Sequence, residues 1–143
     1  MKRFKFNLEK ILQLRKFKEE ECKIALGQAI GALNMIENDI KKTALKRYNA
    51  ASQRFNNPQD ISSWENYILR LEQEAEKLVK QAAQAEIIVE EKRSLYLDAS
   101  KDLKAIEKLK EKQQKEYRKE TFKYEMNEID NLTAARLIAN RIK

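Results

Sequence analysis

Apolar residues recur in the second half of the sequence at steps that alternate between four and three residues. They form the run Trp64, Ile68, Leu71, Ala75, Leu78, Ala82, Ala85, Val89, Lys92, Tyr96, Ala99, Leu103 and Ile106, in which only Lys92 is charged. We call this run the seam. A mean step of about 3.5 residues is typical of a left-handed coiled coil, because it keeps one face of a helix turned toward a partner helix. The sequence therefore predicts a long helix that another helix must cover.

A second apolar series lies upstream, and a turn separates the two. The upstream series is Leu26, Ala29, Leu33, Ile36, Ile40, Ala44, Tyr48, Ala51 and Phe55. Pro58 stands among asparagines and serines, which are turn residues, and proline disrupts a helix interior. Ser62 and Glu65 have the spacing of a capping box at a helix start. We predict one helix over about 7–55, a turn over 56–62 and a second helix over about 63–143.

Two such helices joined by a short turn make an antiparallel hairpin. With the turn near residue 59, residue i faces about residue 119 − i, and the second helix continues past its partner for about 30 residues, or ~45 Å. There the seam becomes more polar, with Lys110, Gln113, Tyr117, Glu120 and Tyr124. The predicted fold class is all-α: a long two-helix antiparallel coiled-coil hairpin with an overhanging C-terminal helix, in a single domain over 1–143. The part after residue 125 is either a binding segment or a frayed, solvated end.

The composition argues against an enzyme. The chain has no histidine, the commonest general base and metal ligand. Gly27 and Gly31 lack the lysine and the spacing of a phosphate-binding loop, and Cys22 has no neighbour that marks a nucleophile. We predict no catalytic residue, no cofactor and no metal site. A single cysteine and the absence of a long apolar stretch predict a soluble, cytoplasmic protein without membrane insertion.

The net charge of +7 is unevenly distributed. Residues 1–23 carry eight Lys/Arg and four Glu, residues 101–143 carry twelve Lys/Arg and eight Asp/Glu, and residues 60–100 carry five Lys/Arg and nine Asp/Glu. Folding back brings the two basic regions together at the open end of the hairpin. Because acidic residues are interleaved throughout, most charges are explained as solvated helix faces, and nucleic acid is not the expected partner. The basic excess favours attraction of an acidic partner.

Two sets of residues are candidate protein-binding sites. The turn-end site is Tyr48, Phe55, Trp64 and Tyr67, aromatic residues that either fill the end of the core or present a contact surface. Tyr67 is next to the seam, so we expect it to be partly exposed. The open-end site is Lys110, Lys112, Lys115, Arg118, Lys119, Met126, Ile129 and Leu132. The apolar members of this second set have no partner within the hairpin, which is typical of a binding segment or of disorder.

Four stretches of the chain resemble the FliJ family of the bacterial flagellar export apparatus. They are FKFNLEKILQLR at 4–15, WENYI at 64–68, LKAIEKLKEK at 103–112 and EID at 128–130. The resemblance implies a non-enzymatic coiled-coil component of flagellar type III protein export, similar in shape to the central stalk of rotary ATPases. It implies three partners: the ring of the export ATPase, the cytoplasmic domain of the export-gate membrane protein, and export chaperones.

Applied to this chain, the resemblance assigns the turn-end site to the export gate and the open-end site to the ATPase ring. The location it implies is the cytoplasm, with peripheral attachment at the inner face of the cell membrane, and a protein that is monomeric alone. Two hypotheses compete with it: a structural coiled coil that associates with itself, and a weak basic coiled coil that binds nucleic acid. Sedimentation tests the first, and DNA binding across a salt series tests the second.

Overall fold

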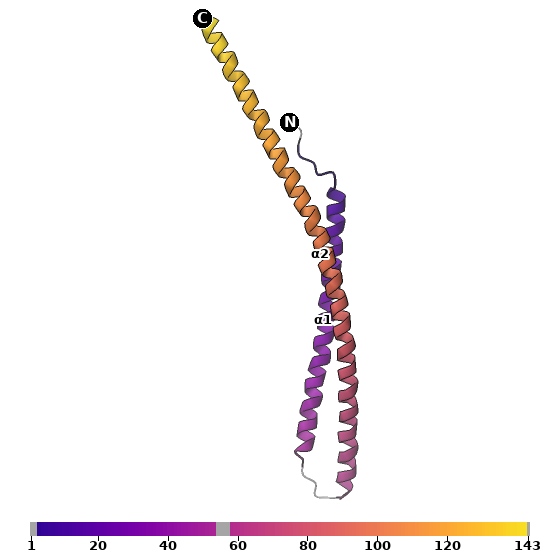
Figure 1. Cartoon of the computed structure of the whole chain (residues 1–143). Coiled ribbons are helices and arrows are strands. Elements are labelled where there is room, and N and C mark those ends of the chain that lie inside the picture. Colours follow the sequence, from indigo (N-terminus) through magenta and orange to yellow (C-terminus); the bar gives the residue numbers. More distant parts are fainter. Residues whose placement is uncertain (1–2, 54–57, 143) are drawn as a thin grey trace. The chain divides into compact units, whose positions relative to one another are not determined.

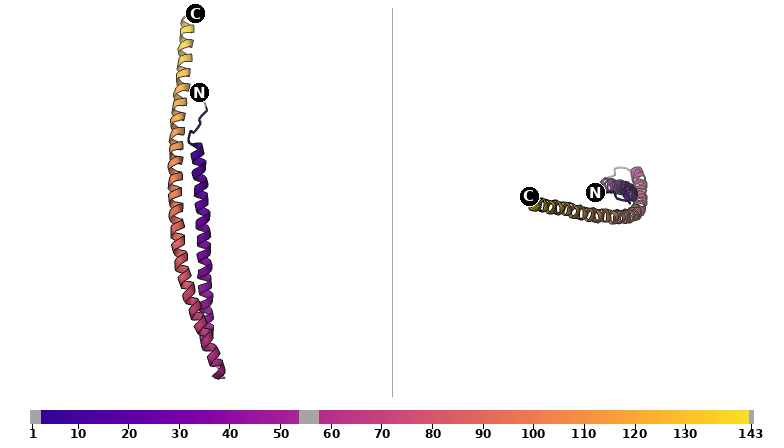
Figure 2. Two further views of the ribbon diagram at one scale, coloured as in Figure 1. Left: turned by 90° about the vertical axis from the view of Figure 1, so that its right-hand side faces the viewer. Right: turned by 90° about the horizontal axis from the view of Figure 1, so that it is seen from above.

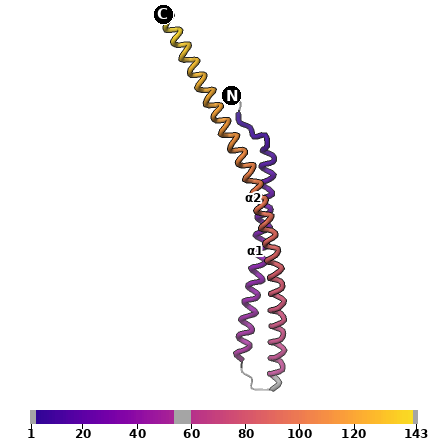
Figure 3. The backbone as a smooth tube through the Cα atoms, viewed as in Figure 1, coloured from indigo at the N-terminus to yellow at the C-terminus, as the bar shows by residue number. Residues whose placement is uncertain are grey.

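The computed structural model describes residues 3–53 and 58–142, with side chains except at 58, 59 and 142. These residues form two helices, α1 (Glu9–Ala51) and α2 (Pro58–Ile142), and no strand, and 94% of them are helical. The helices run antiparallel and pack against each other (Figures 1 and 3). The predicted all-α two-helix hairpin is confirmed.

The ends of the helices differ from the predicted boundaries. Helix α1 begins at Glu9 rather than near residue 7 and ends at Ala51 rather than at 55, and α2 begins at Pro58 rather than near 63. Proline is favoured in the first turn of a helix, where its missing N–H would have no partner, so Pro58 opens α2. Ser62 lies inside α2, and its predicted role as the N-cap is wrong.

Hydrogen bonds to backbone carbonyls close the last turn of α1. The N–H of Ser52 donates to the carbonyl of Tyr48 at 3.2 Å, and the N–H of Gln53 donates to the carbonyl of Ala50 at 3.2 Å. The hydroxyl of Ser52 also donates to the Tyr48 carbonyl at 3.0 Å. Carbonyls at the end of a helix need such partners, and serine supplies one from its side chain.

The chain divides into two compact units. Unit 1 comprises residues 1–17 and 100–143, and unit 2 comprises residues 18–99. Each contains part of α1 and part of α2. The interpretation as one domain over 1–143 stays a prediction.

In unit 2, α2 contacts α1 through the predicted seam. Every seam residue from Trp64 to Ala99 is buried or half-buried, and every residue between them is exposed. Figure 2 shows the two helices side by side over this region. Removing these apolar side chains from water is the main force that holds such a helix pair together.

The predicted series on α1 is correct as far as Ile40 and wrong beyond it. Tyr48 and the two alanines of that series, at 44 and 51, are exposed, whereas Thr43 and Ala50 are buried. A step of 3.5 residues requires strict alternation of threes and fours, which leads from Ile40 to Thr43 and then to Ala50. The predicted series used three steps of four in succession because they met more apolar residues.

In unit 1, a non-helical segment of residues 3–8 helps α1 to cover α2. Phe6, Leu12 and Ile106 are buried together, and Phe4, Leu8 and Leu103 pack against them. The ring of Phe4 lies 5.6 Å from the ring of Tyr117, centre to centre. The guanidinium of Arg15 donates to the carbonyl of Asp102 at 2.8 Å. The seam of α2 is therefore covered as far as Tyr117.

The antiparallel register agrees with the prediction in both units. Arg47 pairs with Glu72 in unit 2, and Glu9 pairs with Lys110 in unit 1. The residue numbers of both pairs add to 119, as predicted from a turn near residue 59. Beyond this paired region, every residue from Phe122 to Arg141 is exposed, so α2 continues without cover in unit 1 (Figure 2).

Candidate protein-binding sites

The turn-end site divides into one inward and two outward aromatic residues. The indole N–H of Trp64 donates to the carbonyl of Ala50 at 2.7 Å, and Trp64 is half-buried. Tyr48 is 72% exposed and Tyr67 is 41% exposed. The core interpretation therefore fits Trp64, and the surface interpretation fits the two tyrosines. Phe55 lies outside the described residues.

A groove runs between the helices beside these aromatic residues. Its first part, of about 400 Å³, is lined by Tyr48, Trp64, Ile68 and two alanines of α1, at 44 and 51. Side chains this small leave space open next to the tryptophan. Arg47 and Glu72 also line this part of the groove. Apolar and aromatic side chains with a few charged groups beside them are typical of a surface that receives a side chain from a partner.

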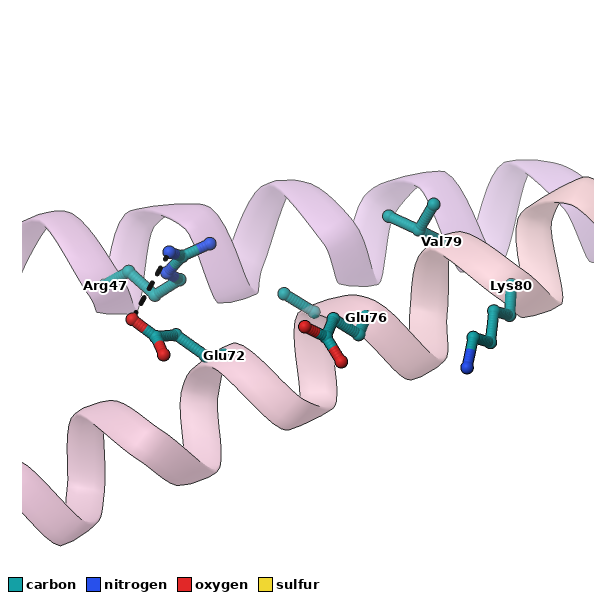
Figure 4. Close-up of a pocket in the computed structure, with 6 residues that line it drawn as sticks. Arg47, Glu72, Glu76, Val79 and Lys80 are labelled. Carbon is teal, nitrogen blue, oxygen red and sulfur yellow. Dashed lines mark ion pairs between the residues drawn. The ribbon is translucent and has the colours of Figure 1, made fainter.

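The groove continues along α2 past an ion pair. Arg47 lies 4.0 Å from Glu72, and both side chains are about half exposed. The next part, of about 470 Å³, is also lined by Glu76, Val79 and Lys80 (Figure 4). An exposed pair of this kind contributes little to stability, so its charges are available to a partner. The sequence interpretation did not single out Arg47, because it placed Tyr48 in the apolar series of the first helix.

The lysines and arginine of the open-end site do not all face solvent. Lys110 is a seam residue: its ammonium lies 2.9 Å from the Glu9 carboxylate and 6.0 Å from the centre of the Phe6 ring. Lys112, Lys115, Arg118 and Lys119 are exposed, and Lys115 lies 3.5 Å from Glu111. Lys110 therefore stabilises unit 1, and the other four cations are on its surface.

The pair with Lys110 also changes the acidity of Glu9. The hydrogen bond from Lys110, with a second from Gln13, lowers the pKa of the Glu9 carboxyl below its ordinary value. Farther along α2, the hydrogen bond that Tyr124 makes with Glu128 raises the pKa of the tyrosine hydroxyl. Both groups keep their ordinary charge at neutral pH.

The apolar members of the open-end site are all exposed. Met126 is 41%, Ile129 54% and Leu132 63% exposed, and Leu137 and Ile138 beside them are exposed as well. Burying a large apolar side chain stabilises a complex by about 1.5–3 kcal/mol. This part of α2 therefore has the apolar surface that a partner could cover.

Among residues 3–53 and 58–142, no group of three His, Cys, Asp or Glu side chains forms a metal-binding arrangement. Over the same residues, neither helix has a stretch long and apolar enough to cross a bilayer.

These features define a class: an antiparallel helical pair whose candidate sites are surfaces that contact other proteins. Residues 4–142, nearly the whole chain, match the family model described as flagellar FliJ protein, and the chain belongs to this family. Members of this family are components of flagellar type III protein export rather than enzymes. No curated protein and no solved structure gives a match.

Proposed function

We propose that this protein is a stalk and adaptor of the export apparatus, which connects the ring of the export ATPase, the cytoplasmic domain of the export gate and the export chaperones. It acts without catalysis. It is monomeric alone, and it works in the cytoplasm, attached peripherally to the inner face of the cell membrane through the apparatus.

The observation that carries this proposal is the uncovered part of α2. From Phe122 to Arg141 each residue is exposed, and seven of them are large apolar or aromatic side chains: Phe122, Tyr124, Met126, Ile129, Leu132, Leu137 and Ile138. An apolar surface of this kind is costly in water and is typical of a segment that a partner covers.

The turn-end site supports a second partner at a different place in the chain. Tyr48 and Tyr67 are exposed beside the groove next to Trp64, and tyrosines in such positions often dominate the binding energy of an interface. Under this proposal the groove binds the export gate. Two separate surfaces, one in each unit, allow both partners to bind at once.

Deleting residues 126–143 tests the ATPase half of the proposal. Because residues 126–141 are exposed throughout, the truncated protein should keep its helicity and melting temperature. It should lose binding to the export ATPase and any stimulation of ATP hydrolysis. A full-length control with glutamine at Met126, Ile129 and Leu132 separates loss of the apolar side chains from loss of length. Normal stimulation by the truncated protein would show that this segment is a frayed, solvated end.

Two measurements address the competing hypotheses. Sedimentation of the protein alone should give a monomer, whereas a self-associating coiled coil would give a dimer or a larger species. Binding to duplex DNA should be weak at physiological salt, whereas a nucleic-acid-binding protein would show tight binding that falls steeply as salt rises.

A further inference from the structure

Unit 1 has a line of exposed residues on the side of α2 opposite to α1. The seam positions of α2 that are buried or half-buried here are Ile106, Lys110, Gln113 and Tyr117, and the same alternation continues through the exposed Glu120 and Tyr124. The residue two places after each position lies about 200° around the helix. Counting in this way, with the same alternation of four and three, gives Lys108, Lys112, Lys115, Lys119, Phe122, Met126 and Ile129. We call these seven residues the back line.

Every residue of the back line is exposed. The apolar residues Phe122, Met126 and Ile129 are 64%, 41% and 54% exposed. Their spacing is that of a coiled-coil seam, which is the pattern that a second protein surface can cover along one side of a helix.

The back line has two chemically different halves. Its first four residues are lysines and its last three are apolar. Residues 101–119 as a whole carry eight Lys/Arg and four Asp/Glu, so the positive charge of the lysines is not balanced locally. Of these four lysines, Lys115 makes an ion pair with Glu111, at 3.5 Å, with both side chains mostly exposed. An exposed ion pair of this kind contributes little to stability, so it does not prevent Lys115 from binding another carboxylate.

We propose that the export ATPase contacts α2 on the back line, through carboxylates that meet the lysines and an adjoining apolar patch that covers Phe122, Met126 and Ile129. This inference rests on the proposed function and adds which face of α2 is bound. The complementary surface must follow the helix for about 30 Å, since 21 residues separate Lys108 from Ile129 at about 1.5 Å each. Of the open-end site, the line keeps Lys112, Lys115, Lys119, Met126 and Ile129.

The other members of the open-end site lie off the line. Lys110 faces the opposite way and pairs with Glu9. Arg118 is one residue before Lys119, and Leu132 is three residues after Ile129, so both lie at the flank of the line. The structure separates Lys110 from the others, because it is half-buried beside Glu9 and Phe6 whereas Arg118 and Leu132 are exposed.

The two halves should affect different rate constants. Lysines attract an acidic surface before contact, so they control the association rate and its dependence on salt. Apolar side chains are buried only after contact, so they control the dissociation rate.

Two variants test the apolar half of the line. Each variant carries two substitutions to alanine, one at an aromatic residue and one at an isoleucine. Phe122→Ala with Ile129→Ala changes the line, and Tyr124→Ala with Ile138→Ala changes the opposite face of the same exposed segment. Binding of the full-length chain to the purified export ATPase is measured by interferometry. The line variant should dissociate about ten-fold faster or more, while the control should stay within about two-fold of the unchanged protein. Circular dichroism should show equal helicity, since alanine is the best helix former.

The lysines are tested by Lys112→Gln, Lys115→Gln and Lys119→Gln together. A control with the same loss of charge carries Lys5→Gln, Lys10→Gln and Lys16→Gln, at exposed positions of unit 1 outside α2. The line variant should associate more slowly at low salt, by about ten-fold, with a flatter salt dependence and an unchanged dissociation rate. The control should lose clearly less.

The outcomes separate this inference from the proposed function. If the unchanged protein does not bind the ATPase, the proposed function is wrong. If it binds, and the line variants bind as tightly as their controls or more tightly, the ATPase contacts a different face, and the back-line inference is overturned while the proposed function stands.

Discussion

Helix α2 is covered in different ways in the two units. In unit 2, α2 lies against α1 along a regular seam that is apolar or aromatic except for Lys92, with an open groove where α1 has small side chains. In unit 1, the seam contains Lys110 and Gln113, and the cover comes from the start of α1 and from Phe4 and Phe6 in the non-helical segment 3–8. The packing of helix against helix in unit 2 depends on the spacing of residues along each helix. The packing of segment 3–8 on α2 in unit 1 depends on particular aromatic rings.

This difference predicts that the units respond to different substitutions. A carboxylate at a buried seam position should destabilise unit 2. Unit 1 should depend on a few residues of segment 3–8, and the loss of one of them should leave unit 2 intact.

The largest expected effect is that of Leu78→Asp in unit 2. Leu78 is 8% exposed, and a carboxylate buried there without a partner costs several kcal/mol, a large part of the stability of an ordinary domain. Thermal melting followed by far-UV circular dichroism should show loss of the cooperative transition. The matched control is Val79→Asp, one residue away and 58% exposed, which should change the melting temperature only slightly. Equal effects of the two substitutions on the melting temperature would contradict the conclusion that the seam residues form the core of unit 2.

The next effect in size is that of Phe6→Ala in unit 1. The Phe6 ring is buried against Leu12 and Ile106, and truncation of a buried phenylalanine costs about 3–5 kcal/mol. Amide hydrogen exchange should accelerate over residues 103–117 and stay unchanged over 64–99. Phe17→Ala serves as the control, because Phe17 is exposed and its loss should alter exchange in neither region. If Phe6→Ala accelerates exchange in unit 2 equally, the units do not respond separately.

A smaller effect is expected from Tyr67→Ala at the turn-end site. Tyr67 is partly exposed and makes no part of the seam, so the melting temperature should stay unchanged. If the groove binds the export gate, affinity for its cytoplasmic domain should fall by about 1–2 kcal/mol, measured by calorimetry. Trp64→Ala is the contrasting variant, because it removes an inward ring and a hydrogen bond to Ala50 and should lower the melting temperature as well. If Tyr67→Ala lost both binding and its folded structure, Tyr67 would be a core residue rather than a contact residue.

The features that follow from spacing could be predicted from the sequence. The seam of α2 from Trp64 to Ile106, the antiparallel register and the partial exposure of Tyr67 all depend on counting residues along a regular helix. The last turns of α1 were mispredicted because spacing and apolarity disagree there. Thr43 and Ala50 continue the alternation, whereas Ala44 and Tyr48 are as apolar or more so, and the structure follows the spacing.

The contacts of unit 1 could not be predicted in this way. Phe4 and Phe6 stand outside any helix, so no period relates them to Tyr117 or Ile106. Lys110 was assigned to the open-end site, although the predicted register places it opposite Glu9, its partner 101 residues away in the sequence. The positions of the back line follow from the predicted seam by counting, and the structure adds that each of these residues is exposed.

The smallest expected effect concerns the pH dependence of unit 1. Hydrogen bonding to Lys110 lowers the pKa of Glu9 in the folded protein below its unfolded value, so the carboxylate stabilises unit 1 at neutral pH. That contribution is present above the unfolded pKa and is lost as the pH falls through the folded pKa. The stability of the unchanged protein and of Glu9→Gln, measured by urea titration, should therefore differ at pH 7 and converge as the pH falls through the lowered pKa of Glu9. Because the pair is partly exposed, the difference should be small and should shrink in high salt. Glu20→Gln, at an exposed position of the same helix, is the control for loss of one surface carboxylate. A difference between Glu9→Gln and the unchanged protein that persists in acid would show that Glu9 acts through packing rather than through its charge.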